Sequence, residues 1–266
     1  MTAFLSSGQP AWMRTRLDTV TLSHTDVPAL TVDSGLSQEG DGLNNLVFVY
    51  GSSGGDWTLN VCARGEADTD AAATGYMKTV SFSRKGSLVT LGGPVRNGNF
   101  GPWATLDVEA PPGAPIDIND SFGAVRVEGV TGPVWVSSPV GRTTILNTTG
   151  SVDATAFIVD FAGSCGPVVL HSGTINLKLT ETVFRGALHA AAEGPVKVLL
   201  PRKFQTPFQA MVKRKRDFVC RADLCSAVRQ QETNGWYTFS YRGGGRQSTG
   251  PVTLRSDRAT VVIDNW

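Results

Sequence analysis

Hydrophobic and polar residues alternate over short runs along most of the chain, and runs with helical spacing are nearly absent. Because successive side chains of a β-strand point to opposite faces, this period of two predicts half-buried strands. In the first part of the chain the pattern predicts strands at 17–23, 29–34, 45–51, 57–65, 76–86, 87–92 and 104–111. Glycine, aspartate, asparagine or serine separates most of them, as turns require. The small residues at 71–74 are interpreted as a loop rather than a helix.

A repeat follows a break rich in proline and glycine at 111–115. Gly123, Gly132, Gly141 and Gly150 stand nine residues apart, and each opens a unit in which the third and fifth residues tend to be apolar. The unit returns at 166–172, 173–179, 194–200 and 250–256. One unit cannot bury its two apolar side chains alone, whereas a stack of units can. Two units would make one coil of about 18 residues.

We therefore expect an all-β protein, a parallel β-solenoid resembling a β-helix with about nine residues per strand. A β-rich N-terminal part would span 1–110, and the solenoid would span 111–266 with a basic insertion at 201–249. An antiparallel sandwich, whose strands also recur every 8 to 12 residues, is the alternative. The expected core residues are Val125, Val127, Val134, Val136, Ile145, Val152, Val168, Leu170, Ile175, Leu177, Val196 and Val198.

Four motifs carry a family resemblance: SFGAVRVEGVTGPVWV at 121–136, GPVVLHSGTINLKL at 166–179, GPVKVLLP at 194–201 and GPVTLRSDRATVVID at 250–264. Their serial order resembles the family of β-solenoid proteins called putative adhesins, over about 104–200 and 250–264. The resemblance implies a β-solenoid fold. It carries no catalytic residue over to this chain.

Charge and hydrophobicity exclude several classes of protein. The chain has 24 basic and 23 acidic residues, and this balance argues against general nucleic-acid binding. Its 41% of hydrophobic residues argues against disorder. No apolar run approaches 18 residues, so no membrane span is expected. Polar residues at 6–9 interrupt the first apolar stretch, so no signal peptide is expected and the location would be cytoplasmic. The cell surface or the extracellular space stays open if a leader has been removed.

The insertion at 201–249 holds ten basic and three acidic residues, a local charge of +7. Lys213, Arg214, Lys215 and Arg216 form its densest run, which could bind a polysaccharide or an anionic surface. They could equally be solvated charges that protect a sheet edge from aggregation. A strand expected at 236–241 would pair with 208–215 or 217–222.

Trp135 should face outward, because its neighbours Val134 and Val136 are expected in the core. An outward tryptophan could stack on a sugar or on a partner subunit. The alternative is that the N-terminal part of the chain covers it.

The final run, 259–266, ends without an obvious polar cap. An uncapped solenoid end exposes unpaired backbone groups. We therefore expect a homo-oligomer that forms through this end, with Val261, Ile263 and Trp266 in the contact.

The chain lacks the usual sequence signals of catalysis. None of its three histidines lies in a zinc-protease motif, and there is no phosphate-binding loop. The glycines and serines at 51–55 are interpreted as a hairpin turn. A nucleophile at Ser164 or Cys165 with His171 as its base would lack an orienting acid. No catalytic residue, metal site or cofactor is expected.

The four cysteines are interpreted mainly as thiols. Cys220 and Cys225 are close enough in sequence for a disulfide that closes a loop, whereas Cys62 and Cys165 have no near neighbour.

Taken together, these patterns favour a non-enzymatic structural or interaction scaffold that self-associates or presents a sheet face to a partner. A surface- or polysaccharide-binding module resembling an adhesin is the first alternative. The second is a carbohydrate-active β-helix enzyme that uses Asp153 or Asp160, since glycosidases employ paired carboxylates.

Overall fold

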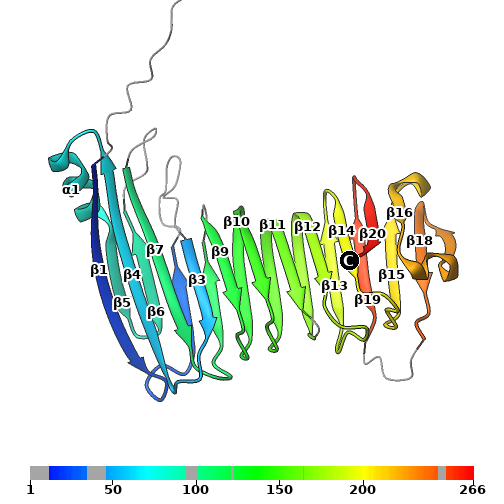
Figure 1. The fold of residues 1–266 in the computed structure, drawn as a ribbon, viewed down its shortest axis with the longest axis horizontal. Helices are drawn as coiled ribbons and strands as arrows, with labels where there is room; N and C mark the ends of the chain where they lie inside the picture. Colours follow the sequence, from blue (N-terminus) through cyan, green and yellow to red (C-terminus); the bar gives the residue numbers. More distant parts are fainter. Residues whose placement is uncertain (1–11, 35–45, 94–100, 121–122, 164, 245–249) are drawn as a thin grey trace, which may run out of the picture.

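The computed structural model describes residues 12–34, 46–93, 101–120, 123–163, 165–244 and 250–266. In these ranges twenty strands join in one mixed sheet, accompanied by one α-helix and two short 3-10 helices (Figure 1). The expectation of an all-β protein is therefore confirmed.

The N-terminal elements are β1 (Trp12–Ser23), β2 (Leu30–Asp33), β3 (Leu46–Gly51), β4 (Asp56–Ala67), α1 (Asp70–Thr79), β5 (Ser81–Lys85), β6 (Leu88–Gly92) and β7 (Gly101–Ala110). The central elements are β8 (Ile116–Asn119), β9 (Ala124–Glu128), β10 (Val134–Leu146), β11 (Val152–Gly163), β12 (Val168–Leu179), β13 (Leu188–Ala192) and β14 (Val196–Leu200). The C-terminal elements are β15 (Phe208–Val212), η1 (Lys215–Asp217), β16 (Phe218–Cys220), η2 (Asp223–Ala227), β17 (Arg229–Thr233), β18 (Trp236–Tyr241), β19 (Val252–Ser256) and β20 (Val261–Asn265).

Parallel strands form two ladders in the middle of the molecule. The first ladder runs from β2 through β8 and the first halves of β10, β11 and β12 to β13, β19 and β15. The second runs from β3 through β9 and the second halves of β10, β11 and β12 to β14, β20 and β16. In β10 the two halves meet at a corner, where the pairing with β11 shifts between Ser138 and Arg142.

The register explains the glycine spacing. Val134 lies opposite Ile116 on one side and Val152 on the other, so each step advances by 18 residues, or two units of nine. Gly150 packs directly on Gly132 of the preceding step, where a Cβ atom would overlap a carbonyl oxygen. Beyond Val152 the step changes in length, since Val152 lies opposite Val168.

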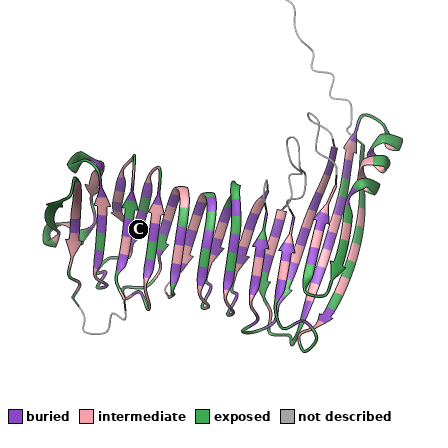
Figure 2. Ribbon diagram, turned by 180° about the vertical axis from the view of Figure 1, so that it is seen from behind, coloured by how far each residue is buried: buried purple, intermediate pink, exposed green. Residues whose placement is uncertain are grey.

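One hydrophobic core runs between the two ladders. Buried and exposed residues alternate along the strands (Figure 2), and all twelve expected core residues are at most 3% exposed. The sheet is continuous across residue 110, because β3 pairs with β7 on one side and β9 on the other.

The sheet is not parallel throughout. Antiparallel pairs join β1 to β4, β4 to β7 and β5 to β6 at one end. At the other end β18 pairs antiparallel with β15 and β17. The sheet as a whole is therefore mixed, with parallel pairs through the middle and antiparallel pairs at both ends. The strand at 236–241 does pair with 208–212, the first of its two expected partners.

The helix α1 was missed by the sequence interpretation, which placed a loop at 71–74 and a strand from residue 76. The Thr69 hydroxyl accepts a hydrogen bond from the Ala72 amide and caps the first turn. Alanines then favour the helix. Gly65 of β4 lets the helix approach the sheet, because a Cβ there would overlap the carbonyl oxygen of Ala73.

The expectation that the last strand ends the sheet is also wrong. β20 lies between β14 and β16, and β19 lies between β13 and β15. The chain leaves the stack after β14 and forms β15 to β18 at the end of the molecule. It then returns, and β19 and β20 take the places between β13 and β15 and between β14 and β16. The C-terminus accordingly lies inside the stack, with β15, β16 and β18 beyond it (Figure 1).

Replacing Gly150 by alanine should lower the free energy of unfolding by about 2–4 kcal/mol, because the backbone of the preceding step must move. Gly55→Ala is the matched control, since nothing lies within 4 Å of the added Cβ. Urea titration followed by tryptophan fluorescence measures both variants. Equal midpoints would contradict the close stacking of the two steps.

Candidate interaction surfaces

Trp135 lies on the outer face of the first ladder, in β10. Its neighbours Val134 and Val136 are 1% and 3% exposed, whereas Trp135 is 44% exposed. The alternation in the sequence therefore gives its orientation correctly, and the N-terminal part of the chain does not bury it.

Two carboxylates flank Trp135. Asp117 of β8 and Asp153 of β11 are its register neighbours on either side, at the spacing of about 4.8 Å between adjacent strands. Two residues further along, Ser137 likewise stands between Asn119 and Thr155. The surface thus combines one aromatic ring with side chains that donate and accept hydrogen bonds. We call these six residues the Trp135 face.

A groove of about 600 Å³ adjoins this face. Outward side chains of β11 connect the two, because Asp153, Thr155 and Phe157 alternate with buried residues. Thr155 and Phe157 line the groove with His171, Glu193 and Arg255, among others. Phe157 is 58% exposed, so it offers a second aromatic surface at the corner of the stack.

The four clustered basic residues do not form one free patch. The Lys213 Nζ lies 3.8 Å from the ring centre of Trp236. Arg214 Nε donates to the buried carboxylate of Asp217 at 2.8 Å. This hydrogen bond, followed by the opposite charge, raises the pKa of Arg214 above its ordinary value. These two cations therefore already have partners within the chain.

Lys215 and Arg216 remain exposed on η1. No ion pair or ring contact engages either of them within the described residues. Only these two members of the cluster are thus fully available to an anionic ligand.

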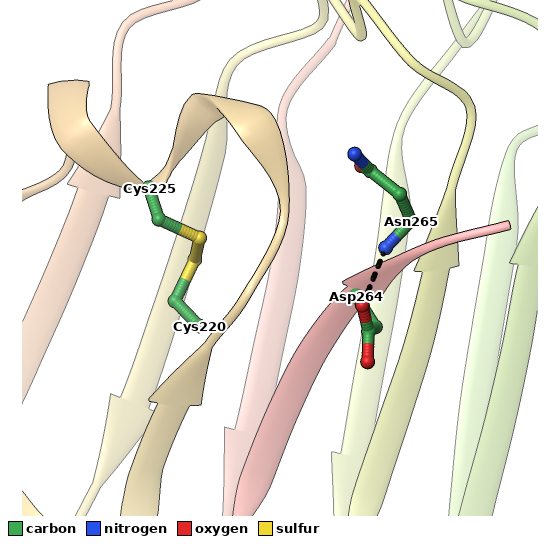
Figure 3. The surroundings of a disulfide bond; sticks show 4 residues. All are labelled: Cys220, Cys225, Asp264 and Asn265. Carbon is green, nitrogen blue, oxygen red and sulfur yellow. Dashed lines mark hydrogen bonds between the residues drawn. A yellow bond between two sulfur atoms is a disulfide. The ribbon is translucent and has the colours of Figure 1, made fainter.

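The rest of the insertion closes the end of the molecule. Phe218 of β16 stacks on Phe239 of β18, with ring centres 3.9 Å apart, and so joins the end of the second ladder to the strand that pairs with β15. Cys220 and Cys225 form a disulfide between β16 and η2, beside Asp264 and Asn265 of β20 (Figure 3). Cys62 and Cys165 are free, partly buried thiols. The insertion is therefore a cap, and a covalent bond fixes part of it.

Two of the three residues expected at a self-association surface lie in the core instead. Val261 and Ile263 are fully buried in the core. Trp266 is 54% exposed, but its indole Nε1 donates to the Leu179 carbonyl at 3.1 Å and its ring lies 4.6 Å from the Lys178 Nζ. A contact through Val261 and Ile263 is not available while β20 is paired on both sides.

The carboxylates considered for catalysis do not form a pair. Asp153 lies on the outer face of the first ladder, and Asp160 faces outward from the second. Asp160 forms an ion pair with Arg142 and accepts a hydrogen bond from Asn176 at 2.7 Å. Cys165 and His171 lie before and within β12, six residues apart in an extended stretch, and Ser164 is outside the described residues.

Two features of the Trp135 face were missed in the sequence. Asp117 and Asp153 stand 18 residues before and after Trp135. Counting one coil of 18 residues in each direction from Trp135 would have identified both aspartates. The outward position of Phe157 follows from the alternation after Val152, but the groove depends on residues from five strands and the turns beside them.

Among the described residues no helix has the length and hydropathy needed to span a membrane.

Comparisons with known proteins give distant matches. No protein-family model matches the chain, and no curated protein matches it. A crystal structure of a putative cell adhesion protein from Clostridium sporogenes matches at 9% identity and a TM-score of 0.30, covering 95% of this chain and 99% of that one. A putative adhesin from Bacteroides fragilis matches at 12% identity and a TM-score of 0.28, covering 94% and 97%. The function proposed for this chain rests on its own residues.

Removing the disulfide by Cys220→Ser and Cys225→Ser together should lower the free energy of unfolding by about 2 kcal/mol, the value expected for so short a loop. Thermal unfolding with and without reductant measures this. Cys165→Ser should unfold like the parent chain and keep the sensitivity to reductant. An unchanged midpoint in the double variant would show that the bond does not stabilise the cap.

Proposed function

We propose that this protein is a non-enzymatic interaction scaffold, similar to an adhesin, that presents the Trp135 face to a glycan. The observation that carries the proposal is an exposed tryptophan set between two carboxylates on the outer face of a parallel ladder. Sugar rings stack on indoles through their C–H faces, and their hydroxyls bind to carboxylates and amides. The groove beside Phe157 would extend the same site.

The parallel middle of the sheet would be a β-solenoid that holds this face flat. Steps of 18 residues between β8, β10 and β11, and a core shared by both ladders, support this interpretation. We propose that this solenoid spans 111–266 and that residues 1–110 form a β-rich part beside it. The motif order that resembles the adhesin family at 104–200 and 250–264 is consistent with it.

We also propose that the protein works outside the cytoplasm. Disulfides persist mainly in oxidising compartments, and the cap contains one. This observation favours the cell-surface alternative over the cytoplasmic location expected from the N-terminal residues.

Binding to an anionic surface is a second candidate function. Lys215 and Arg216 favour it, because they are exposed on the cap and lack a partner within the described residues. Their number is small, so we expect weak binding, and because both side chains are exposed we expect salt to screen it.

Replacing Trp135 by alanine should weaken glycan binding at least about tenfold, as loss of a central aromatic contact does. Affinity electrophoresis through gels containing β-glucan, arabinoxylan or mannan measures the effect. Trp266→Ala is the control, because it also removes an exposed tryptophan. Retardation by none of the polysaccharides, or equal retardation of Trp135→Ala and the parent chain, would contradict the proposal.

Replacing Lys215 and Arg216 by serine should abolish salt-sensitive binding to vesicles that contain an anionic lipid. The control, Arg84→Ser with Lys85→Ser, removes the same charge from β5, far from the cap. Vesicle co-sedimentation at low and physiological salt separates the two variants. If both lose binding equally, the effect belongs to net charge and not to the cap.

A further inference from the structure

The ends of a sheet are where a second chain can add. Among the described strands β1, β5, β16 and β17 each pair with a single neighbour. Three of these edges are protected against pairing with another chain. β16 is only three residues long, and β5 ends in Arg84 and Lys85. Every residue of β17 is exposed, and its side chains are polar or charged.

The edge strand β1 is different. It has twelve residues and pairs with β4 over its whole length. Trp12, Met13 and Leu17 are 48%, 56% and 74% exposed, and Leu17 has the largest exposure among the large hydrophobic residues described. A long edge with apolar side chains is a template for pairing with another strand.

The sequence at the centre of β1 is complementary to itself. Thr15, Arg16, Leu17, Asp18 and Thr19 read the same in both directions, except that Arg16 exchanges with Asp18. In an antiparallel pair centred on Leu17, each arginine therefore lies opposite an aspartate. Opposite charges across strands stabilise such a pair, whereas like charges destabilise it.

Other registers lack this complementarity. A register centred on Arg16 sets the Arg16 side chains of the two copies against each other, and a register centred on Asp18 does the same with the two Asp18 side chains. A shift by one sets outer side chains against inner ones, because side chains alternate between the faces. Only the register centred on Leu17 gives two opposite-charge pairs without a like-charge pair.

We propose that two copies of this chain form a dimer by antiparallel pairing of their β1 strands around Leu17. The sheet would run continuously from one copy to the other, with Leu17 against Leu17 of the partner subunit on the outer face. On the inner face Arg16 would meet Asp18 of the partner subunit. Such an interface is isologous and closed, so it does not lead to fibres.

The charges are already held in place for this contact. Arg16 Nε donates to Asp18 at 2.8 Å within one chain, and Arg16 also donates to the Val80 carbonyl at 3.1 Å. Arg14 is held by Asp70 at the start of α1. Dimerisation would extend the Arg16–Asp18 pair into a ring of four alternating charges.

The dimer goes beyond the proposed function and does not depend on it. It would place two Trp135 faces in one assembly, so a polymeric glycan could bind both.

Light scattering after size exclusion tests the dimer across a hundredfold range of concentration. The parent chain should give about twice 28.2 kDa. Arg16→Asp should raise the dissociation constant at least tenfold, because two aspartates then face each other. Arg16→Asp combined with Asp18→Arg should restore the dimer, because the opposite charges return in exchanged positions.

The matched control exchanges Arg126 and Glu128, which form the same kind of pair on β9, a strand with neighbours on both sides. This exchange should leave the mass unchanged. A second test joins Thr15→Cys to Thr19→Cys, which should give a disulfide-linked dimer on oxidation, whereas either cysteine alone should not. A parent chain that remains monomeric, or a dimer that neither the charge reversal nor the cysteine pair affects, would overturn the proposal.

Discussion

The strands in the middle of this protein depend on a neighbour stacked on each side. Parallel strands about 4.8 Å apart bury their apolar side chains only when the strands before and after them supply the rest of the core. Close stacking also limits the corners, where Gly150 rests on Gly132 without room for a Cβ. The same constraint applies at the two ends of the stack, where the outermost strand has no neighbour on one side and must be protected.

The chain closes the two ends of the stack in different ways. At the end near the C-terminus, residues 201–244 supply a cap with a disulfide and a stacked pair of phenylalanines, and its edge strands are short or polar. At the other end β1 and β4 turn the sheet antiparallel, and α1 packs on β4. The long β1 edge is the place where a second copy fits.

Alternation along the sequence was sufficient to predict the all-β class, the twelve core residues and the outward position of Trp135. It could not predict which strand lies last, because the spatial order departs from the chain order where β19 and β20 return between earlier strands and the insertion. Long-range contacts also determine which residues of the basic run at 213–216 are available to a ligand, since the ring of Trp236 lies against Lys213. The helix was missed because its small residues resemble a loop when the partner, Gly65, is not known.

These features describe a stacked sheet whose middle carries the proposed binding face and whose C-terminal end is closed by its own insertion. In this arrangement β20 is an interior strand, paired on both sides. Hydrogen–deuterium exchange of the backbone amides, read by mass spectrometry on peptides from 259–266, tests it most directly. The amides of β20 should exchange as slowly as those of β11 and much more slowly than those of β17. Exchange of β20 as fast as that of β17 would show that the C-terminal strand is an open edge, and would contradict its place between β14 and β16.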